Sequence, residues 1–214
     1  IAATGATWVR FDFDWSIIQP DNASTYRWAV YDKLVAASRK RNLKVLGIIT
    51  YTPGWARASA CRETSKCYPA NSAQFAAFAA AAASRYKGSG LHYWEVWNEP
   101  NNPQFWAPGA SPAHYTQLLK QTATAVRQRD SLAYIMTGGL SPQDTTATSY
   151  APADFLTAVY KAGGKPYFDA VADHPYTFPL SPKSTEYHAW NQMAIGSGSL
   201  RQIMVNNGDG GKKV

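Results

Sequence analysis

The fold is decided by the segment Tyr93-Trp94-Glu95-Val96-Trp97-Asn98-Glu99-Pro100. Its aromatic and β-branched residues favour an extended strand. Proline cannot donate a backbone hydrogen bond, so strand pairing has to stop by Pro100, which leaves Asn98 and Glu99 at the carboxyl end. Because side chains alternate along a strand, Glu95, Trp97 and Glu99 are expected on one face. Two buried carboxylates are costly unless they are hydrogen-bonded or used chemically, so this face predicts a functional site.

Similar segments recur along the chain and alternate with helical ones. Runs rich in β-branched and aromatic residues predict strands over Trp8–Phe13, Lys44–Tyr51, His92–Trp97, Ala133–Thr137 and Phe168–His174. Apolar residues with helical spacing predict helices over Trp28–Arg41, Ser72–Tyr86, Pro112–Arg129, Pro152–Ala162 and His188–Asn206. This alternation, with a period of about 40 residues, predicts an α/β fold with a parallel sheet.

The loops differ at the two ends of the predicted strands. Loops that leave the carboxyl ends, such as 51–71 and 98–111, are long and rich in Trp, Tyr, Pro and Asn, whereas the returning loops are short. In parallel α/β folds the site lies at that edge. No G-x-G-x-x-G follows the first predicted strand, and no G-x-x-x-x-G-K-[ST] occurs. The pattern therefore favours a (β/α)8 barrel over a doubly wound dinucleotide-binding sheet.

The length of 214 residues is short for a complete barrel, which typically needs about 250 residues. We expect residues 1–214 to be a single but partial barrel domain, an internal portion of a longer chain. Its first residues resemble the end of a helix capped by Gly5. The last residues, Lys212-Lys213-Val214, resemble the start of a strand.

The charge pattern argues against a nucleic-acid partner. The formal net charge is +7, but the basic residues are scattered, and only Arg39-Lys40-Arg41 and Lys212-Lys213 cluster, at predicted element boundaries. This pattern is typical of a solvated surface, although affinity for anionic cell-wall polymers or membrane surfaces stays open. No apolar run approaches the roughly 20 residues that a transmembrane helix needs.

The two cysteines, Cys61 and Cys67, lie in one polar loop. Two cysteines without a neighbouring histidine would make a poor metal site, and we expect neither a metal nor a cofactor. A local disulfide is the favoured interpretation, and free thiols are the alternative. A disulfide would favour an extracytoplasmic or secreted protein.

Three motifs resemble one family of enzymes. Trp97-Asn98-Glu99-Pro100 resembles the fourth-strand signature of the clan of retaining β-glycosidases that includes glycoside hydrolase families 5 and 39. Trp8–Trp15 is similar to the clan's second strand and His174-Pro175-Tyr176 to its sixth. The resemblance implies a glycoside hydrolase with a TIM barrel. The chain would cover its second strand to the start of its seventh, without the first, most of the seventh and the eighth.

The resemblance also implies roles in the hydrolysis of O-glycosidic bonds of a β-linked glycan or glycoside. Glu99 would be the general acid/base, and Asn98 would hydrogen-bond the sugar 2-hydroxyl. Arg10 and Tyr176 would hold the nucleophile, and His174 would contact the sugar or the acid/base.

Two of these side chains, Arg10 and His174, could instead have purely structural roles. Arg10 could form an ion pair with Asp12 or Glu95, because a buried guanidinium demands a carboxylate. His174 could be a hydrogen-bonded core histidine.

Four tryptophans, Trp15, Trp55, Trp97 and Trp106, fall at or after the carboxyl ends of predicted strands. Tryptophan faces stack on sugar rings, so we expect at least two of them to line a carbohydrate-binding cleft, although any one could be packing.

None of the residues given a role so far would be the nucleophile. Retaining hydrolysis needs a second carboxyl group about 5–5.5 Å from the acid. None of the four glutamates, Glu63, Glu95, Glu99 and Glu186, follows a seventh strand. We expect the nucleophile just after Val214, so the chain alone would be catalytically incomplete. The alternatives are a carbohydrate-binding barrel that lacks a nucleophile, and a basic nucleic-acid-binding or surface-adhesion protein.

Overall fold

The structure is a computed structural model that describes residues 1–186 and 188–214. Its sheet has four parallel strands in chain order, β1 (Trp8–Asp14), β2 (Lys44–Thr50), β3 (Tyr93–Val96) and β4 (Tyr134–Thr137). The α-helices are α1 (Trp15–Ile18), α2 (Ala29–Lys40), α3 (Ser72–Tyr86), α4 (Pro112–Arg129), α5 (Pro152–Lys161), α6 (Ala189–Gln192) and α7 (Leu200–Asn206). The first four expected strands are confirmed, and they form part of a barrel wall.

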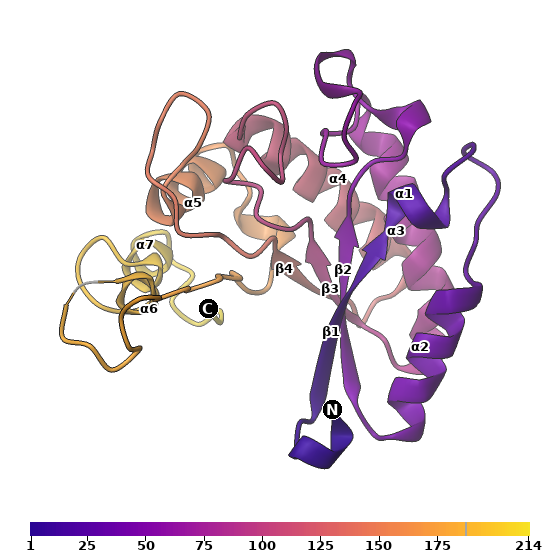
Figure 1. The fold of residues 1–214 in the computed structure, drawn as a ribbon, viewed down its shortest axis with the longest axis horizontal. Helices are drawn as coiled ribbons and strands as arrows, with labels where there is room; N and C mark the ends of the chain where they lie inside the picture. The colour runs from indigo at the N-terminus through magenta and orange to yellow at the C-terminus, as the bar shows by residue number, and fades with distance from the viewer. Residues whose placement is uncertain (187) are drawn as a thin grey trace.

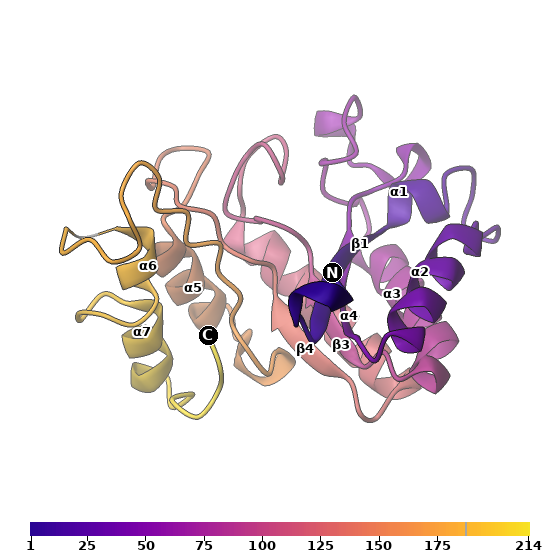
Figure 2. The same cartoon turned by 60° about the horizontal axis from the view of Figure 1, so that its bottom comes forward.

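The helices cover the outer face of this wall. In Figures 1 and 2, α2 and α3 lie on one side of the molecule, whereas α5, α6 and α7 gather on the other. Helix α4 contacts both α3 and α5 and so joins the two groups. Since the strands are parallel, their carboxyl ends share one edge, and the long loops leave from it.

The core lies between the strands and α2–α4. Phe13 of β1 is fully buried and contacts the rings of Tyr31, Tyr86 and Trp94 at centroid distances of 5.2–5.3 Å. Arg10, Asp12 and Asp14 alternate with the phenylalanines of β1, so they point to the opposite, inner face. The polar side chains of β1 are thereby directed away from the core.

Two of the expected elements differ in the structure. Phe168–His174 is not a regular strand, although isolated parallel bridges join Met136 to Ala170 and Leu140 to Asp173. Regular pairing is interrupted because a side chain, the Thr137 hydroxyl, accepts the Ala172 N–H at 3.0 Å in place of a backbone carbonyl. A further bridge joins Ala170 to Lys213, so the final residues lie where a further strand was expected.

The expected helix His188–Asn206 was also wrong as a single element. Helices α6 and α7 are separated by a turn in which Gly196 has a φ of 90°. A helix cannot continue through that left-handed conformation. None of the helices in the two described ranges is both long and apolar enough to cross a bilayer.

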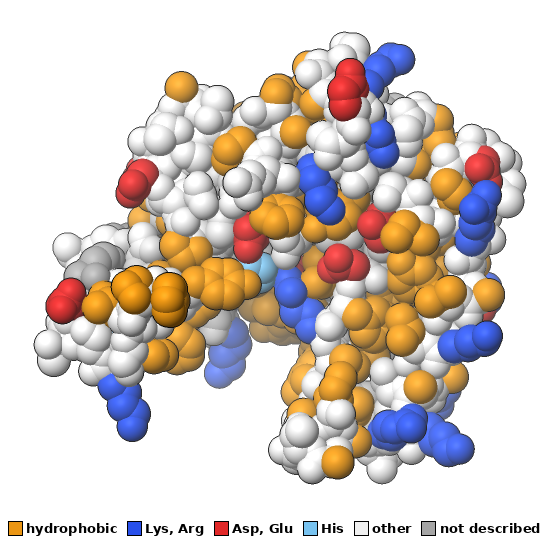
Figure 3. Space-filling view, in the orientation of Figure 1, with side chains coloured by type: hydrophobic (Ala, Val, Ile, Leu, Met, Phe, Trp, Pro, Cys, Tyr) orange, Lys and Arg blue, Asp and Glu red, His pale blue; other side chains and the backbone are white. Residues whose placement is uncertain are grey.

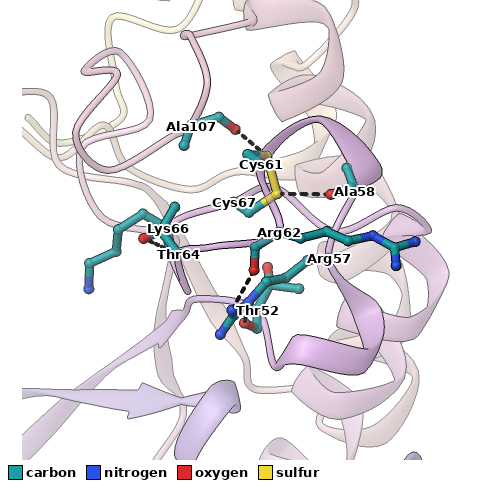
Figure 4. The surroundings of a disulfide bond; sticks show 9 residues. All are labelled: Thr52, Arg57, Ala58, Cys61, Arg62, Thr64, Lys66, Cys67 and Ala107. Carbon is teal, nitrogen blue, oxygen red and sulfur yellow. Dashed lines mark hydrogen bonds between the residues drawn. A yellow bond between two sulfur atoms is a disulfide. The ribbon is translucent and has the colours of Figure 1, made fainter.

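The cysteine loop after β2 is closed as expected. Cys61 and Cys67 form a disulfide, with their Cα atoms 5.3 Å apart. Figure 4 shows the disulfide beside Ala107, which belongs to the loop that follows β3. A parallel bridge between Cys67 and Ala107 joins the two loops.

The glycine in the middle of β2 gives a test of the core. A Cβ atom at Gly47 would lie 2.7 Å from the Trp94 ring and 2.9 Å from the Phe13 ring. Neither ring can move without disturbing its neighbours, so Gly47→Ala should lower the free energy of unfolding by about 1–3 kcal/mol. Urea unfolding measures the difference. Gly88→Ala, where a Cβ meets no atom within 4 Å, is the matched control. Equal effects of the two substitutions would contradict this account of the packing.

Candidate active site

The strand ends at the site have an unusual backbone. Tyr51 after β2 and Trp97 and Glu99 after β3 all have positive φ, at 59°, 72° and 49°. Left-handed residues other than glycine cost about 1–3 kcal/mol each, so the surrounding contacts must enforce them. Two of these contacts are the hydrogen bonds from Trp97 N to Ile49 O, at 2.9 Å, and from Glu99 N to Gly139 O, at 3.0 Å.

This backbone separates side chains that a regular strand would keep together. The Trp97 ring packs on Phe75 and Trp106, at centroid distances of 5.7 and 5.0 Å, on the helix side of the sheet. Glu99 instead reaches His174. The expectation that Trp97 shares a face with Glu95 and Glu99 was therefore wrong, because the left-handed turn breaks the alternation of side chains.

Glu99 is nearly enclosed and has two side-chain partners. Only 7% of the residue is exposed. Its Oε1 lies 2.8 Å from His174 Nδ1, and its Oε2 accepts a hydrogen bond from Asn102 Nδ2 at 3.4 Å. The expectation that His174 contacts this carboxyl group is thus met in the structure.

The other nitrogen of His174 fixes the tautomer. His174 Nε2 lies 3.1 Å from Nη2 of Arg10. A guanidinium can only donate, so Nε2 must accept, and the proton of a neutral imidazole resides on Nδ1. His174 then donates to Glu99 and orients its carboxylate.

Arg10 forms the ion pair with Glu95 that the sequence left open. Its Nε and Nη2 donate to the two carboxylate oxygens of Glu95 at 2.8 Å each. Burial lowers the pKa of Arg10, but the hydrogen bond and charge of Glu95 raise it, and the net shift is upward. Nη2 also donates to Asn98 Oδ1 at 3.4 Å. The Arg10 side chain is still 39% exposed, so one side of the guanidinium is open.

A glycine pair after β4 completes the site. Gly139 N donates to Glu95 Oε1 at 2.9 Å, and a Cβ on Gly139 would lie 2.3 Å from His174 Nε2. Gly138 N donates to the Tyr115 hydroxyl, which in turn donates to Val96 O. Neither glycine was expected at the site from the sequence, although a Gly-Gly pair directly after a predicted strand was a usable signal.

A cavity of about 500 Å³ lies beside Arg10 and His174. Asp173, Tyr176 and Trp190 also line it. Tyr176 is 70% exposed, and its ring centroid lies 6.1 Å from that of His174. Figure 3 shows acidic, basic and histidine side chains gathered near the middle of this face. The roles expected for Arg10, Asn98 and Tyr176 toward sugar and nucleophile stay predictions.

The tryptophans behave differently from the expectation. Trp15, Trp97 and Trp106 are at most 1% exposed and pack in the core, so none presents a ring face to a sugar. The prediction of a stacking role was wrong for these three, because the loops fold their indoles between strands and helices. Trp55 is half-buried, and its Nε1 donates to Gln19 O at 2.9 Å. A sugar contact by Trp55 stays a prediction.

Comparison with known proteins identifies the family. The sequence model of the cellulase family (glycosyl hydrolase family 5) matches residues 1–194. The chain belongs to this family. The search of curated protein sequences found no match.

Solved glycoside hydrolases share the fold of this cellulase-family chain. A family 39 glycoside hydrolase from Bacteroides cellulosilyticus WH2 aligns with 85% of this chain and 35% of its own, at 23% identity and a TM-score of 0.64. A glucosidase from Croceicoccus marinus aligns over 96% and 44%, at 14% identity and a TM-score of 0.67. The exo-beta-1,4-mannosidase Op5Man5 from Opitutaceae bacterium strain TAV5 aligns over 85% and 34%, at 20% identity and a TM-score of 0.60. These identities establish the barrel fold alone, and the chain spans less than half of each relative's length.

A pH dependence of stability follows from Asp173. Burial raises its pKa to about 6, although His174 acts in the opposite direction. The unfolded state ionises near its ordinary pKa of 3.8, so between these values the folded state binds more protons. The free energy of unfolding should therefore fall as the pH rises from about 4 to about 6, and Asp173→Asn should make this fall smaller.

Urea unfolding of the wild type and of Asp173→Asn across this range measures the effect. Asp144→Asn, in the exposed loop before α5, is the matched control and should keep the wild-type slope. An unchanged slope in Asp173→Asn would rule out Asp173 as the source.

Proposed function

We propose that the protein containing this chain hydrolyses β-O-glycosidic bonds with retention of configuration, with Glu99 as general acid/base. The observation that carries the proposal is the continuous chain of contacts Glu95–Arg10–His174–Glu99. It holds one carboxyl group, nearly enclosed, at the carboxyl edge of a parallel sheet, where barrel enzymes carry out their chemistry.

Glu99 has the surroundings that an acid/base needs. When protonated, it would give its proton to the leaving oxygen, while the His174 Nδ1–H orients the carboxyl group through Oε1. In the second step the Glu99 carboxylate would take a proton from the attacking water.

The proposed nucleophile is a glutamate on the strand that continues from Lys213. The bridge between Ala170 and Lys213 starts that strand beside the segment that carries His174 and Tyr176. Its carboxyl end would therefore reach the open side of Arg10, whose charge would keep the nucleophile ionised. The Asn98 amide, 3.4 Å from the same guanidinium, is the proposed partner of the sugar 2-hydroxyl.

The disulfide supports an extracytoplasmic location, which we include in the proposal. Disulfides persist in oxidising compartments and are rare in the cytosol. The Cys61–Cys67 bond closes a loop next to the proposed site, so an oxidising environment would preserve the geometry of the site.

The test is Glu99→Gln in the full-length protein. Hydrolysis of cellohexaose or xylohexaose should fall by about 100- to 10,000-fold, the usual contribution of a general acid/base. An activated aryl β-glycoside, whose leaving group needs no proton, should lose much less in its first step. Added azide should restore turnover and give a β-glycosyl azide, because azide attacks the covalent intermediate without general-base help.

Glu63→Gln, an exposed residue of the cysteine loop, is the matched control and should behave as the wild type. NMR of the first-formed sugar reports the configuration. An α-anomer as initial product would overturn the retaining mechanism. A wild type that binds oligosaccharides without turnover would indicate a carbohydrate-binding barrel.

A further inference from the structure

Lys66 is a cation whose role the proposed mechanism does not explain. It lies in the disulfide-closed loop, and its Nζ sits 3.0 Å from the centroid of the Tyr51 ring. Within residues 1–186 and 188–214, its ammonium group forms no salt bridge and no hydrogen bond. The N–H donors that do not face the Tyr51 ring are therefore available to a ligand.

The backbone around Lys66 is fixed from both sides. Ser65 O accepts from Thr52 N at 2.9 Å, and Lys66 O accepts from Ala107 N at 3.0 Å. The disulfide closes the loop one residue later, at Cys67. Figure 4 shows the Lys66 side chain pointing away from the disulfide. The loop thus presents the ammonium group from a rigid support, and a rigid support limits the entropy lost on binding.

Tyr51, the residue beneath Lys66, connects the cation to the proposed site. Tyr51 has the left-handed backbone that follows β2, and its ring meets that of Trp97 edge-on at 5.8 Å. Burial raises the pKa of Tyr51, and the charges of Asp12, Asp14 and Glu99 raise it further. The Tyr51 ring therefore contacts the segment that carries Glu99, since Trp97 precedes Glu99 by two residues.

Asp12 and Asp14 supply acceptors on the same side. Both are on the inner face of β1 and pair in register with Ile48 and Thr50 of β2, just before Tyr51. Asp14 also accepts from Ser16 N at 2.8 Å, whereas Asp12 is exposed. Desolvation lowers the pKa of Lys66, and the two carboxylates act in the opposite direction. The Lys66 ammonium group, the two carboxylates and the Tyr51 ring thus lie at the carboxyl ends of β1 and β2, on the sheet edge that also carries Glu99.

We propose that Lys66 is a specificity-determining residue that donates hydrogen bonds to hydroxyl groups of an uncharged sugar residue next to the scissile bond. Asp12 accepts from a hydroxyl of the same sugar. The proposal rests on the hydrolase function proposed above. Two carboxylates outnumber the ammonium group at this part of the sheet edge, so it repels a uronate and suits a neutral sugar whose hydroxyl groups both donate and accept.

The test is Lys66→Met in the full-length protein, because methionine keeps an apolar stem over Tyr51 and removes the charge. KM for a neutral oligosaccharide that the wild type cleaves, chosen from cellohexaose, xylohexaose and mannohexaose, should rise roughly tenfold, as expected for loss of a hydrogen bond to a charged group. The value of kcat should change much less. Lys66→Arg should fall between the two proteins.

Lys33→Met, an exposed residue of α2, removes the same charge and is the control. The double variant Cys61→Ala/Cys67→Ala should also raise KM, and combining it with Lys66→Met should add little, because both changes remove the same contact. Additive changes in KM would mean that the disulfide affects binding by another route than Lys66. They would overturn the proposal that the disulfide holds Lys66 in place.

Three further results decide the proposal. An unchanged KM in Lys66→Met, with or without lower stability, would make Lys66 a structural residue and overturn it. A wild-type preference for glucuronic-acid-bearing xylo-oligosaccharides that Lys66→Met abolishes would overturn the choice of a neutral sugar. If the wild type hydrolyses none of the probes, the hydrolase proposal fails, and titration of the same oligosaccharides by tryptophan fluorescence still tests whether Lys66→Met weakens binding.

Discussion

The rest of the site depends on the ion pair between Arg10 and Glu95. Glu95 is 1% exposed, so its carboxylate is tolerable only because a guanidinium and a backbone N–H satisfy it. The partners lie on β1 and β3 with β2 between them, a separation of roughly 10 Å that only long side chains can bridge. An ion pair that buries one of its two charges gains little net stability, because desolvation offsets the attraction, so the main effect of the pair is to hold Arg10 in one place.

His174 connects this fixed guanidinium to the Glu99 carboxyl group and orients it. The Arg10 guanidinium can only donate hydrogen bonds, so the neutral imidazole of His174 accepts at Nε2. Its Nδ1–H then donates a hydrogen bond to Glu99. Gly139 makes this possible, since any side chain there would occupy the space of the imidazole. The contacts join β1 and β3 with the segments that follow β3 and β4, so the geometry of Glu99 depends on the packing of several elements.

The left-handed strand ends explain how a hydrophobic core and a polar site share one short segment. Trp97 turns into the core, while Glu99, two residues later, turns toward His174. The strain at these positions is offset by the burial of a large indole and by the hydrogen bonds around it. Tyr51 has the same left-handed conformation, which places its phenol beneath Lys66. A left-handed backbone thus positions side chains at the ends of both β2 and β3.

The sequence by itself determined the class of fold, the order of the strands and the candidate acid, because these depend on local spacing and on motif residues, and it favoured the disulfide over free thiols. It indicated that Arg10 and His174 belong to the site, but it left their partners open. Tertiary structure decided those partners, since Glu95 and His174 lie 85 and 164 residues from Arg10 in the chain. It also assigned Trp15, Trp97 and Trp106 to the core and broke the expected strand Phe168–His174 into isolated bridges. The reason is physical: periodicity fixes which face of an element a side chain leaves from, whereas its neighbours depend on how distant elements pack.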